Sequence, residues 1–241
     1  MTLNIPRHKN ISIQILKDIY ADTSISSFLG FKGGTAAYLF YDLPRFSVDL
    51  DFDYVGSKKD LESARKNMEQ IFSGLGLEIK DKSRKVPQYF LKYPALEGGR
   101  NTIKVDVTFP APKANAYGAQ RLAEIDRIAR CQTIETMFAN KLVALIDRWE
   151  KKESIAGRDL YDIHHFFLQG FSYSKAVIKE RRKTSVKTFF KKLAEFVEKK
   201  VTDKVINQDL NLLLPPDKFQ KTRKTIKRET LMFLKDEIGR R

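Results

Sequence analysis

The chain has 241 residues, 42% of them hydrophobic, which is enough to bury a core in one large domain or two small ones. No stretch approaches the roughly 20 consecutive apolar residues of a membrane-spanning helix, so we expect no membrane partner. Lys and Arg number 45 against 30 for Asp and Glu, a net charge of +15. This excess favours polyanionic partners, because each phosphate that Lys or Arg neutralises releases condensed counterions.

The cysteine content and the first residues indicate the compartment. The single cysteine, Cys131, cannot form a disulfide within the chain, and the N-terminus lacks the apolar segment of a secretory signal. We therefore expect a cytoplasmic protein. Basic residues gather beyond Lys175, in runs such as 179–183 and 221–224, which favours nucleic acid as the macromolecular partner. A basic protein without such a partner is the alternative.

The first 110 residues mix helix and strand patterns. Apolar residues at helical spacing predict a helix over residues 11–20, and a short apolar run over 28–32 leads into Gly33 and Gly34. The further predicted elements are helical turns over 35–40, a break at 42–45, a strand over 46–55, a helix over 57–72, and strands over 77–82, 88–93 and 102–109.

The pattern changes after Pro112. Nearly everything from Gln120 onward is predicted to be helical, with breaks near residues 154–157, 170–172 and 214–216. The sequence therefore predicts an α+β fold, in which a mixed sheet flanked by helices precedes an all-helical C-terminal region. We expect two domains, residues 1–115 and 116–241.

Three aspartates alternate along the strand predicted over residues 46–55. Residues two apart in a strand point to the same face, so Asp49, Asp51 and Asp53 share one face and the apolar residues between them face the core. Aspartate is a poor strand former, and a bound divalent cation would explain the cluster. A solvated face whose carboxylates pair with lysines explains it as well.

The strand predicted over residues 102–109 repeats this alternation. Lys104, Asp106 and Thr108 share one face, and the apolar residues between them share the other. If this strand pairs beside the first, Asp106 joins Asp49 and Asp51. Three carboxylates could then hold two Mg²⁺ ions about 3.5–4 Å apart, and Asp106 would help to deprotonate an attacking hydroxyl.

A glycine turn precedes the aspartate strand. Gly33, Gly34 and Thr35 stand at a predicted strand-to-helix junction, and Thr35 lies 14 residues before Asp49. Glycine lets the backbone approach a phosphate closely, and a helix N-terminus offers N–H groups to it. The combination of this turn, a short helix and an aspartate strand is more specific than either motif alone.

These motifs resemble those of known enzymes. The glycine turn, the short helix, the first aspartate strand and the later one look like the polymerase-β-like nucleotidyltransferase superfamily. More narrowly, residues 31–36 and 45–52 resemble the AbiEii family of bacterial toxins, which includes the MenT toxins. Two later segments support this likeness, residues 135–148 and 157–162, so it spans roughly residues 28–170.

The resemblance implies a polymerase-β-like core and a toxin that transfers a nucleotide from an NTP with Mg²⁺ or Mn²⁺. It implies an RNA acceptor, in characterised relatives the tRNA 3′ end, a resulting block of translation, and a separately encoded antitoxin partner. Asp53 lies outside the family's usual aspartate pair. The implied site residues are Asp49, Asp51, Lys141 and Asp159 for catalysis, Gly33, Gly34, Thr35, Ser47, Lys141 and Arg158 for nucleotide binding, and Asp49, Asp51 and Asp106 for metal binding.

Residues from the second half allow two interpretations. Lys141 shares a helix face with Phe138 and Leu145, so it either extends along the edge of the core or lies buried beside an anion. The resemblance places it at the triphosphate and makes Asp159 an active-site residue, which orients Lys141 or the acceptor. Without the resemblance, Asp159 is an acid favoured in a first helical turn. Arg158 and Asp162 are spaced to form a surface pair.

Two alternative functions stay open at this point. The protein could modify a small molecule, such as an aminoglycoside, or a protein hydroxyl, although a net charge of +15 disfavours small cationic substrates. It could also be a catalytically silent module that binds RNA or nucleotides. The intact carboxylates and Lys141 argue against a silent module.

Overall fold

The computed structural model describes residues 3–83, 86–94, 99–211 and 213–240. The chain forms two compact units. The sheet unit comprises Met1–Asp42, Ser47–Ala111 and Tyr117–Gln132. The helical unit comprises Leu43–Phe46, Pro112–Ala116 and Thr133–Arg241. No helix in the described ranges is long and apolar enough to cross a membrane.

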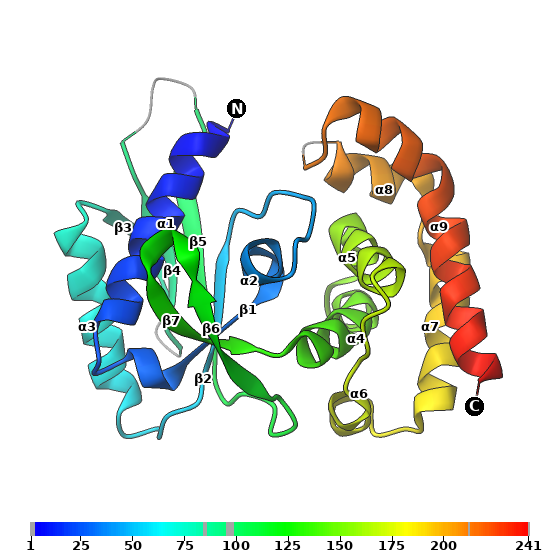
Figure 1. Ribbon diagram of the computed structural model, residues 1–241, viewed down its shortest axis with the longest axis horizontal. Coiled ribbons are helices and arrows are strands. Elements are labelled where there is room, and N and C mark those ends of the chain that lie inside the picture. Colours follow the sequence, from blue (N-terminus) through cyan, green and yellow to red (C-terminus); the bar gives the residue numbers. More distant parts are fainter. Residues whose placement is uncertain (1–2, 84–85, 95–98, 212, 241) are drawn as a thin grey trace. The chain divides into compact units, whose positions relative to one another are not determined.

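Seven strands from the described residues form one sheet (Figure 1). Its order is β3-β4-β5-β2-β1-β7-β6. The pairs β2–β5 and β1–β7 are parallel and the others are antiparallel, so the predicted mixed sheet is confirmed. The strands are β1 (Leu29–Lys32), β2 (Leu50–Tyr54), β3 (Glu78–Lys82), β4 (Gln88–Lys92), β5 (Thr102–Thr108), β6 (Tyr117–Leu122) and β7 (Arg127–Gln132).

Longer helices of the sheet unit cover its core with apolar stripes. In α1 (Ile5–Ala21), Asn4 caps the first turn, and Ile15 and Ile19 are buried one turn apart. In α3 (Leu61–Gly74), Ala64, Met68 and Phe72 are buried at the same spacing. Helix α1 lies beside α3 and β7, and the short α2 (Gly33–Phe40) lies beside β1 and β2. The predicted helices and strands of residues 1–110 are thus confirmed.

The predicted alternation is confirmed in β5 and only in part in β2. In β5, Ile103, Val105 and Val107 are buried, and the residues between them are half-buried. In β2 the apolar residues are buried and Asp51 is half-buried, but Asp53 has no exposed surface. The face of β2 that was expected to be uniformly acidic therefore has two environments.

The helical prediction for residues from Gln120 to Gln132 is wrong. Strands β6 and β7 form a hairpin there, with Asp126 in the left-handed conformation at the turn. The burial alternates as in a strand: Ile128 is 61% exposed, whereas Ala129 and Cys131 are buried. Pairing with the free edge of β1 overrides the local helical pattern. The sheet unit therefore extends to Gln132, past the predicted limit at residue 115.

The helical prediction is confirmed from Thr133 onward. Thr133 caps α4 through its side chain, and Ser174, Ser185 and Thr202 cap later helices in the same way. Helices α7 and α9 pack side by side (Figure 1). The helices are α4 (Ile134–Lys152), α5 (Gly157–Leu168), α6 (Lys175–Arg182), α7 (Val186–Lys200), α8 (Asp203–Leu210) and α9 (Pro216–Gly239).

The buried Asp53 joins five strands of the sheet. Lys32, at the end of β1, donates to Asp53 Oδ1 at 2.6 Å and to Thr108 Oγ1 of β5 at 2.7 Å. Tyr117 of β6 and Gln132 of β7 donate to Asp53 Oδ2 at 2.7 and 2.6 Å. A buried carboxylate is costly unless it is paired and hydrogen-bonded, and these donors meet that requirement. We name this set the Asp53 network.

We expect the substitution Asp53→Asn to destabilise the protein, because the amide presents an N–H group to donors and leaves the Lys32 ammonium without its anion. The free energy of unfolding should fall by about 3 kcal/mol, as when one partner of a buried pair is removed. Urea unfolding followed by circular dichroism measures it. In the control, Asp81→Asn on the exposed face of β3, the change should stay within about 0.5 kcal/mol. Equal losses in the two variants would contradict the role of the network.

Candidate functional site

The predicted glycine turn lies at the junction of β1 and α2. Gly33 has a φ of +80°, which L side chains rarely adopt. A Cβ atom at this position would lie 2.4 Å from Asp51 Oδ2. Both the positive φ of this residue and the close approach of the Asp51 carboxylate thus require glycine. The turn and the Asp51 carboxylate are therefore close together.

Asp49 lies immediately before β2 and is tied to the first turn of α2. Thr35 Oγ1 donates a hydrogen bond to the Asp49 carbonyl oxygen at 2.5 Å. Gly34 is buried behind this contact, and Ser47 lies half-buried two residues before Asp49. The residues predicted for the glycine turn and for the aspartate pair therefore lie together, within the sheet unit.

A histidine that sequence reasoning missed fixes the backbone beside Asp49. His8 of α1 is fully buried, and its Nε2 donates to the Val48 carbonyl oxygen at 2.8 Å. Burial lowers the pKa of His8, so the neutral ring can accept from the Tyr93 hydroxyl at Nδ1, 3.0 Å away. No motif or spacing in the sequence connects a histidine in the first helix with a strand 40 residues later.

Asp106 occupies the predicted register. Strands β2 and β5 are parallel and pair Asp51 with Asp106, so the two residues lie side by side on the same face. The Asp106 carboxylate forms a close ion pair with Lys104 and accepts from Gln88 Nε2 at 3.1 Å.

Metal binding can be judged from the donor set. Asp49, Asp51 and Asp106 offer the carboxylate oxygens that Mg²⁺ and Mn²⁺ prefer. In the described part of the chain, however, no three His, Cys, Asp or Glu side chains are grouped so that they could hold a metal ion. The chemistry of Asp49 and Asp51 fits a divalent cation, and the Asp106 carboxylate contacts Lys104 and Gln88. Metal binding by the three residues stays a prediction.

A second set of predicted residues lies in the helical unit. Lys141 Nζ of α4 contacts Asp159 Oδ1 and Asp162 Oδ2 of α5, each at 2.8 Å. Arg148 Nε pairs with Asp159 Oδ2 at 2.8 Å, and Arg45 forms two hydrogen bonds to Asp162 at 2.5 and 2.6 Å. The charges alternate in the order Arg45, Asp162, Lys141, Asp159, Arg148. We call these five residues the charge chain.

Burial and ion pairing shift the pKa values of residues in the charge chain in opposite directions. Burial favours the neutral form of Asp159, but Lys141 and Arg148 outweigh it and hold the pKa of Asp159 well below its usual range. Burial likewise lowers the pKa of Lys141, but Asp159 and Asp162 outweigh it and raise that pKa. Lys141 is therefore an ammonium ion that contacts two protein carboxylates from a half-buried position, and its role at a nucleotide stays a prediction.

Two members of the charge chain were not predicted in these roles. The spacing of Asp162 and Arg158 allowed a surface pair, but Asp162 is fully buried and pairs with Lys141 and Arg45 instead. Arg158 is half-buried, and its backbone N–H donates to Asp209 at 3.5 Å. The pairing of Arg45 with a residue 117 positions away leaves no pattern in the sequence.

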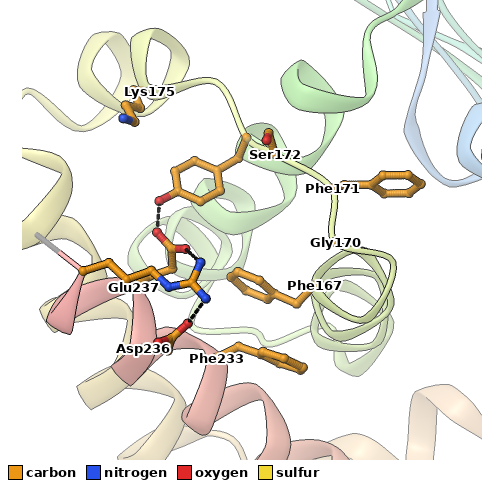
Figure 2. A pocket seen from close by; sticks show the side chains of 10 residues that line it. Phe167, Gly170, Phe171, Ser172, Lys175, Phe233, Asp236 and Glu237 are labelled. Atoms are coloured by element: carbon orange, nitrogen blue, oxygen red, sulfur yellow. Dashed lines mark hydrogen bonds and ion pairs between the residues drawn. The ribbon is translucent and has the colours of Figure 1, made fainter.

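A pocket of about 430 Å³ in the helical unit contains none of the predicted residues (Figure 2). Aromatic rings line it, and those of Phe167 and Phe233 stack with centroids 5.2 Å apart. Its acids are already engaged: Tyr173 donates to Glu237, and Arg240 pairs with Asp236 at 2.7 Å. Both acids of this pocket are thus engaged by neighbouring side chains, and we do not assign the pocket to the functional site.

Solved structures with the same fold were found by comparison. JHP933 from Helicobacter pylori has a TM-score of 0.60 and 21% identity, covering 99% of this chain and 96% of its own. A second H. pylori structure has a TM-score of 0.63 and 21% identity, with coverage of 100% and 98%. MenT4, a nucleotidyltransferase toxin from Mycobacterium tuberculosis, has a TM-score of 0.56 and 16% identity, with coverage of 94% and 82%. At these identities the likeness shows the fold.

The sequence comparison shows the family. No curated protein sequence matches the chain. The family model described as the nucleotidyl transferase AbiEii toxin of type IV toxin–antitoxin systems matches residues 14–230, which is most of the chain. The predicted resemblance is thereby confirmed, and the chain belongs to the AbiEii family of nucleotidyltransferase toxins.

Proposed function

We propose that this protein transfers a nucleoside monophosphate from an NTP to the 3′ end of a tRNA and so blocks translation. The observation that carries the proposal is the contact between Asp51 and Gly33. It brings the acidic pair, Asp49 and Asp51, next to the N-terminus of α2, whose backbone N–H groups favour phosphate oxygens. Nucleotide transfer needs carboxylates and phosphate-binding groups side by side.

The transfer makes one bond and breaks another. The acceptor hydroxyl oxygen bonds to the α-phosphorus, and pyrophosphate leaves with the electron pair of the broken bond. We assign Asp106 to take up the hydroxyl proton, since it lies beside Asp51 in the paired strand. Asp49 and Asp51 would hold Mg²⁺ or Mn²⁺, which neutralises triphosphate charge when bound.

The remaining assignments concern the nucleotide. Thr35 holds the backbone of Asp49, and the small residues of the turn leave room for phosphate. In the helical unit we assign the Lys141 ammonium to the triphosphate and Asp159 to holding that ammonium, which its 2.8 Å contact supports. The residues proposed to bind the nucleotide are Gly33, Gly34, Thr35, Ser47, Lys141 and Arg158.

An RNA acceptor agrees with the charge of the chain. The net charge of +15 attracts a polyanion and disfavours small cationic substrates such as an aminoglycoside. Membership of the AbiEii family implies an antitoxin as a further partner. A protein hydroxyl is the alternative acceptor, and the labelling experiment below separates it from RNA.

We predict that incubation with Mg²⁺, each α-³²P-labelled NTP in turn and a bacterial extract labels tRNA. Asp49→Ala and Asp51→Asn should reduce labelling by at least about 100-fold, as expected when a metal-binding carboxylate is lost, and EDTA should abolish it. Gel electrophoresis of the extract measures the label. Asp81→Asn, on the exposed β3, is the matched control and should label normally. Label on protein would show that the acceptor is a protein hydroxyl. Unchanged labelling in Asp51→Asn would refute the assigned site.

We further predict that induced expression of the wild-type protein arrests bacterial growth and that Asp51→Asn relieves the arrest, because toxicity depends on transfer. Colony counts after induction measure the effect, and immunoblots confirm equal protein levels. Equal arrest by the variant would show that toxicity has another origin.

Lys141→Met should raise the KM for the NTP by at least about 10-fold, because a charge-assisted contact with the triphosphate is lost. Arg148→Met is the matched control: it also removes one cation from Asp159 but keeps the Lys141 ammonium. Steady-state kinetics and thermal unfolding of both variants measure the effects. If the two variants lose activity and stability equally, Lys141 only maintains the structure.

A further inference from the structure

A groove on the helical unit is lined by cations of α9. Its volume is about 550 Å³, and one face of the helix provides its basic side chains. We name these the basic groove: Arg223, Lys224, Lys227, Arg228 and Lys235. Asp203 is the single acid among its lining residues, so the groove carries a local excess of four positive charges.

These cations follow the repeat of the helix. Lys224 and Arg228 are four positions apart, as are Arg223 and Lys227, so each pair lies on one row of the α9 surface. Side chains at this spacing have Cβ atoms about 5–6 Å apart, which is close to the distance between successive phosphates of a nucleic acid strand. One helix face thus presents a linear series of charges.

The basic groove is not neutralised by the protein. Within the described residues, none of its five cations forms an ion pair with Asp or Glu; Lys227 donates to the Glu198 carbonyl oxygen at 3.0 Å, and Arg223 lies over the Phe219 ring. Some cations elsewhere in the helical unit are paired, as Arg182 is with Asp147 and Glu150. Unpaired cations in a row are the arrangement that a polyanion neutralises.

An exposed apolar side chain lies among the cations. Met232 is 62% exposed and lines the groove together with Leu231. Ribose and base surfaces are partly apolar, and a flexible thioether side chain adapts to them without selecting a sequence. The groove therefore combines phosphate-binding charge with a permissive apolar contact.

We propose that the basic groove binds the phosphodiester backbone of RNA and holds the acceptor during nucleotide transfer. The proposal rests on the RNA acceptor of the proposed function and adds the surface that binds it. Contact is electrostatic, does not depend on the RNA sequence and weakens with salt. An acidic protein surface would also be attracted to the basic groove. The affinities of the variants below distinguish the two partners, because charge reversal in the groove weakens RNA binding only if the groove binds RNA.

The test measures binding without transfer. Fluorescein-labelled bulk bacterial tRNA is titrated with the full chain in the absence of NTP, and fluorescence anisotropy gives Kd at several KCl concentrations. The variant K224E/R228E reverses two charges of the groove. The control K187E/K191E reverses two exposed lysines of α7 that have the same four-residue spacing and change the net charge equally.

We expect K224E/R228E to raise Kd by roughly 10- to 100-fold and to lower the slope of log Kd against log salt by about 2, one unit for each lost phosphate contact. The control should change Kd by less than about 3-fold, the effect of long-range charge alone. Circular dichroism melting curves of both variants should match the wild type. Equal Kd values for the two variants, or an unchanged salt slope, would overturn the proposal.

Failure of this proposal differs from failure of the proposed function. If no NTP labels tRNA but K224E/R228E still loses binding, the groove binds RNA and the transfer reaction is wrong. If tRNA is labelled and K224E/R228E binds it normally, the acceptor is held elsewhere and the groove proposal is wrong.

Discussion

The sheet unit depends on the carboxylate of Asp53, a side chain that has no exposed surface. Asp53 lies in the middle of the sheet order, and a carboxylate in that position is tolerated only when donors surround it. Lys32, Tyr117 and Gln132 supply those donors from three other strands. A Cβ at Gly30 would lie 2.4 Å from the Tyr117 ring, so the network also requires glycine in β1. The same strand ends in the turn that contacts Asp51, so the network and the candidate site share one support.

The helical unit also contains buried carboxylates, and it pairs them with several cations. Two buried carboxylates, Asp159 and Asp162, are placed between three cations, and each carboxylate contacts two of them. Alternation of this kind offsets the desolvation cost of each charge, and it raises the pKa of the half-buried Lys141. Two of the three N–H groups of the Lys141 ammonium face these carboxylates, which leaves one for an anionic ligand, the role proposed for it.

Local periodicity predicted most of the fold. The helices before residue 75, the strand bearing Asp51, and the three strands that follow lie where their apolar spacing indicated. The helix prediction failed over residues 120–132, where β6 and β7 form a hairpin and β7 pairs with β1, because strand pairing in the folded sheet overrides local helical spacing. The alternation of side chains along the strand also gave Asp53 the same environment as Asp51. Alternation indicates the face on which a side chain lies, but it does not indicate which residues surround that side chain.

The sequence by itself determined the chemistry: which residue types are present, in what order, and hence the family to which the chain belongs. Only the tertiary structure decided which groups meet. The pairing of Arg45 with Asp162, of His8 with Val48 and of Lys32 with Asp53 joins residues far apart in the chain. Such pairings depend on how strands and helices pack, and packing energies are set by non-local contacts that leave no periodic pattern in a single sequence.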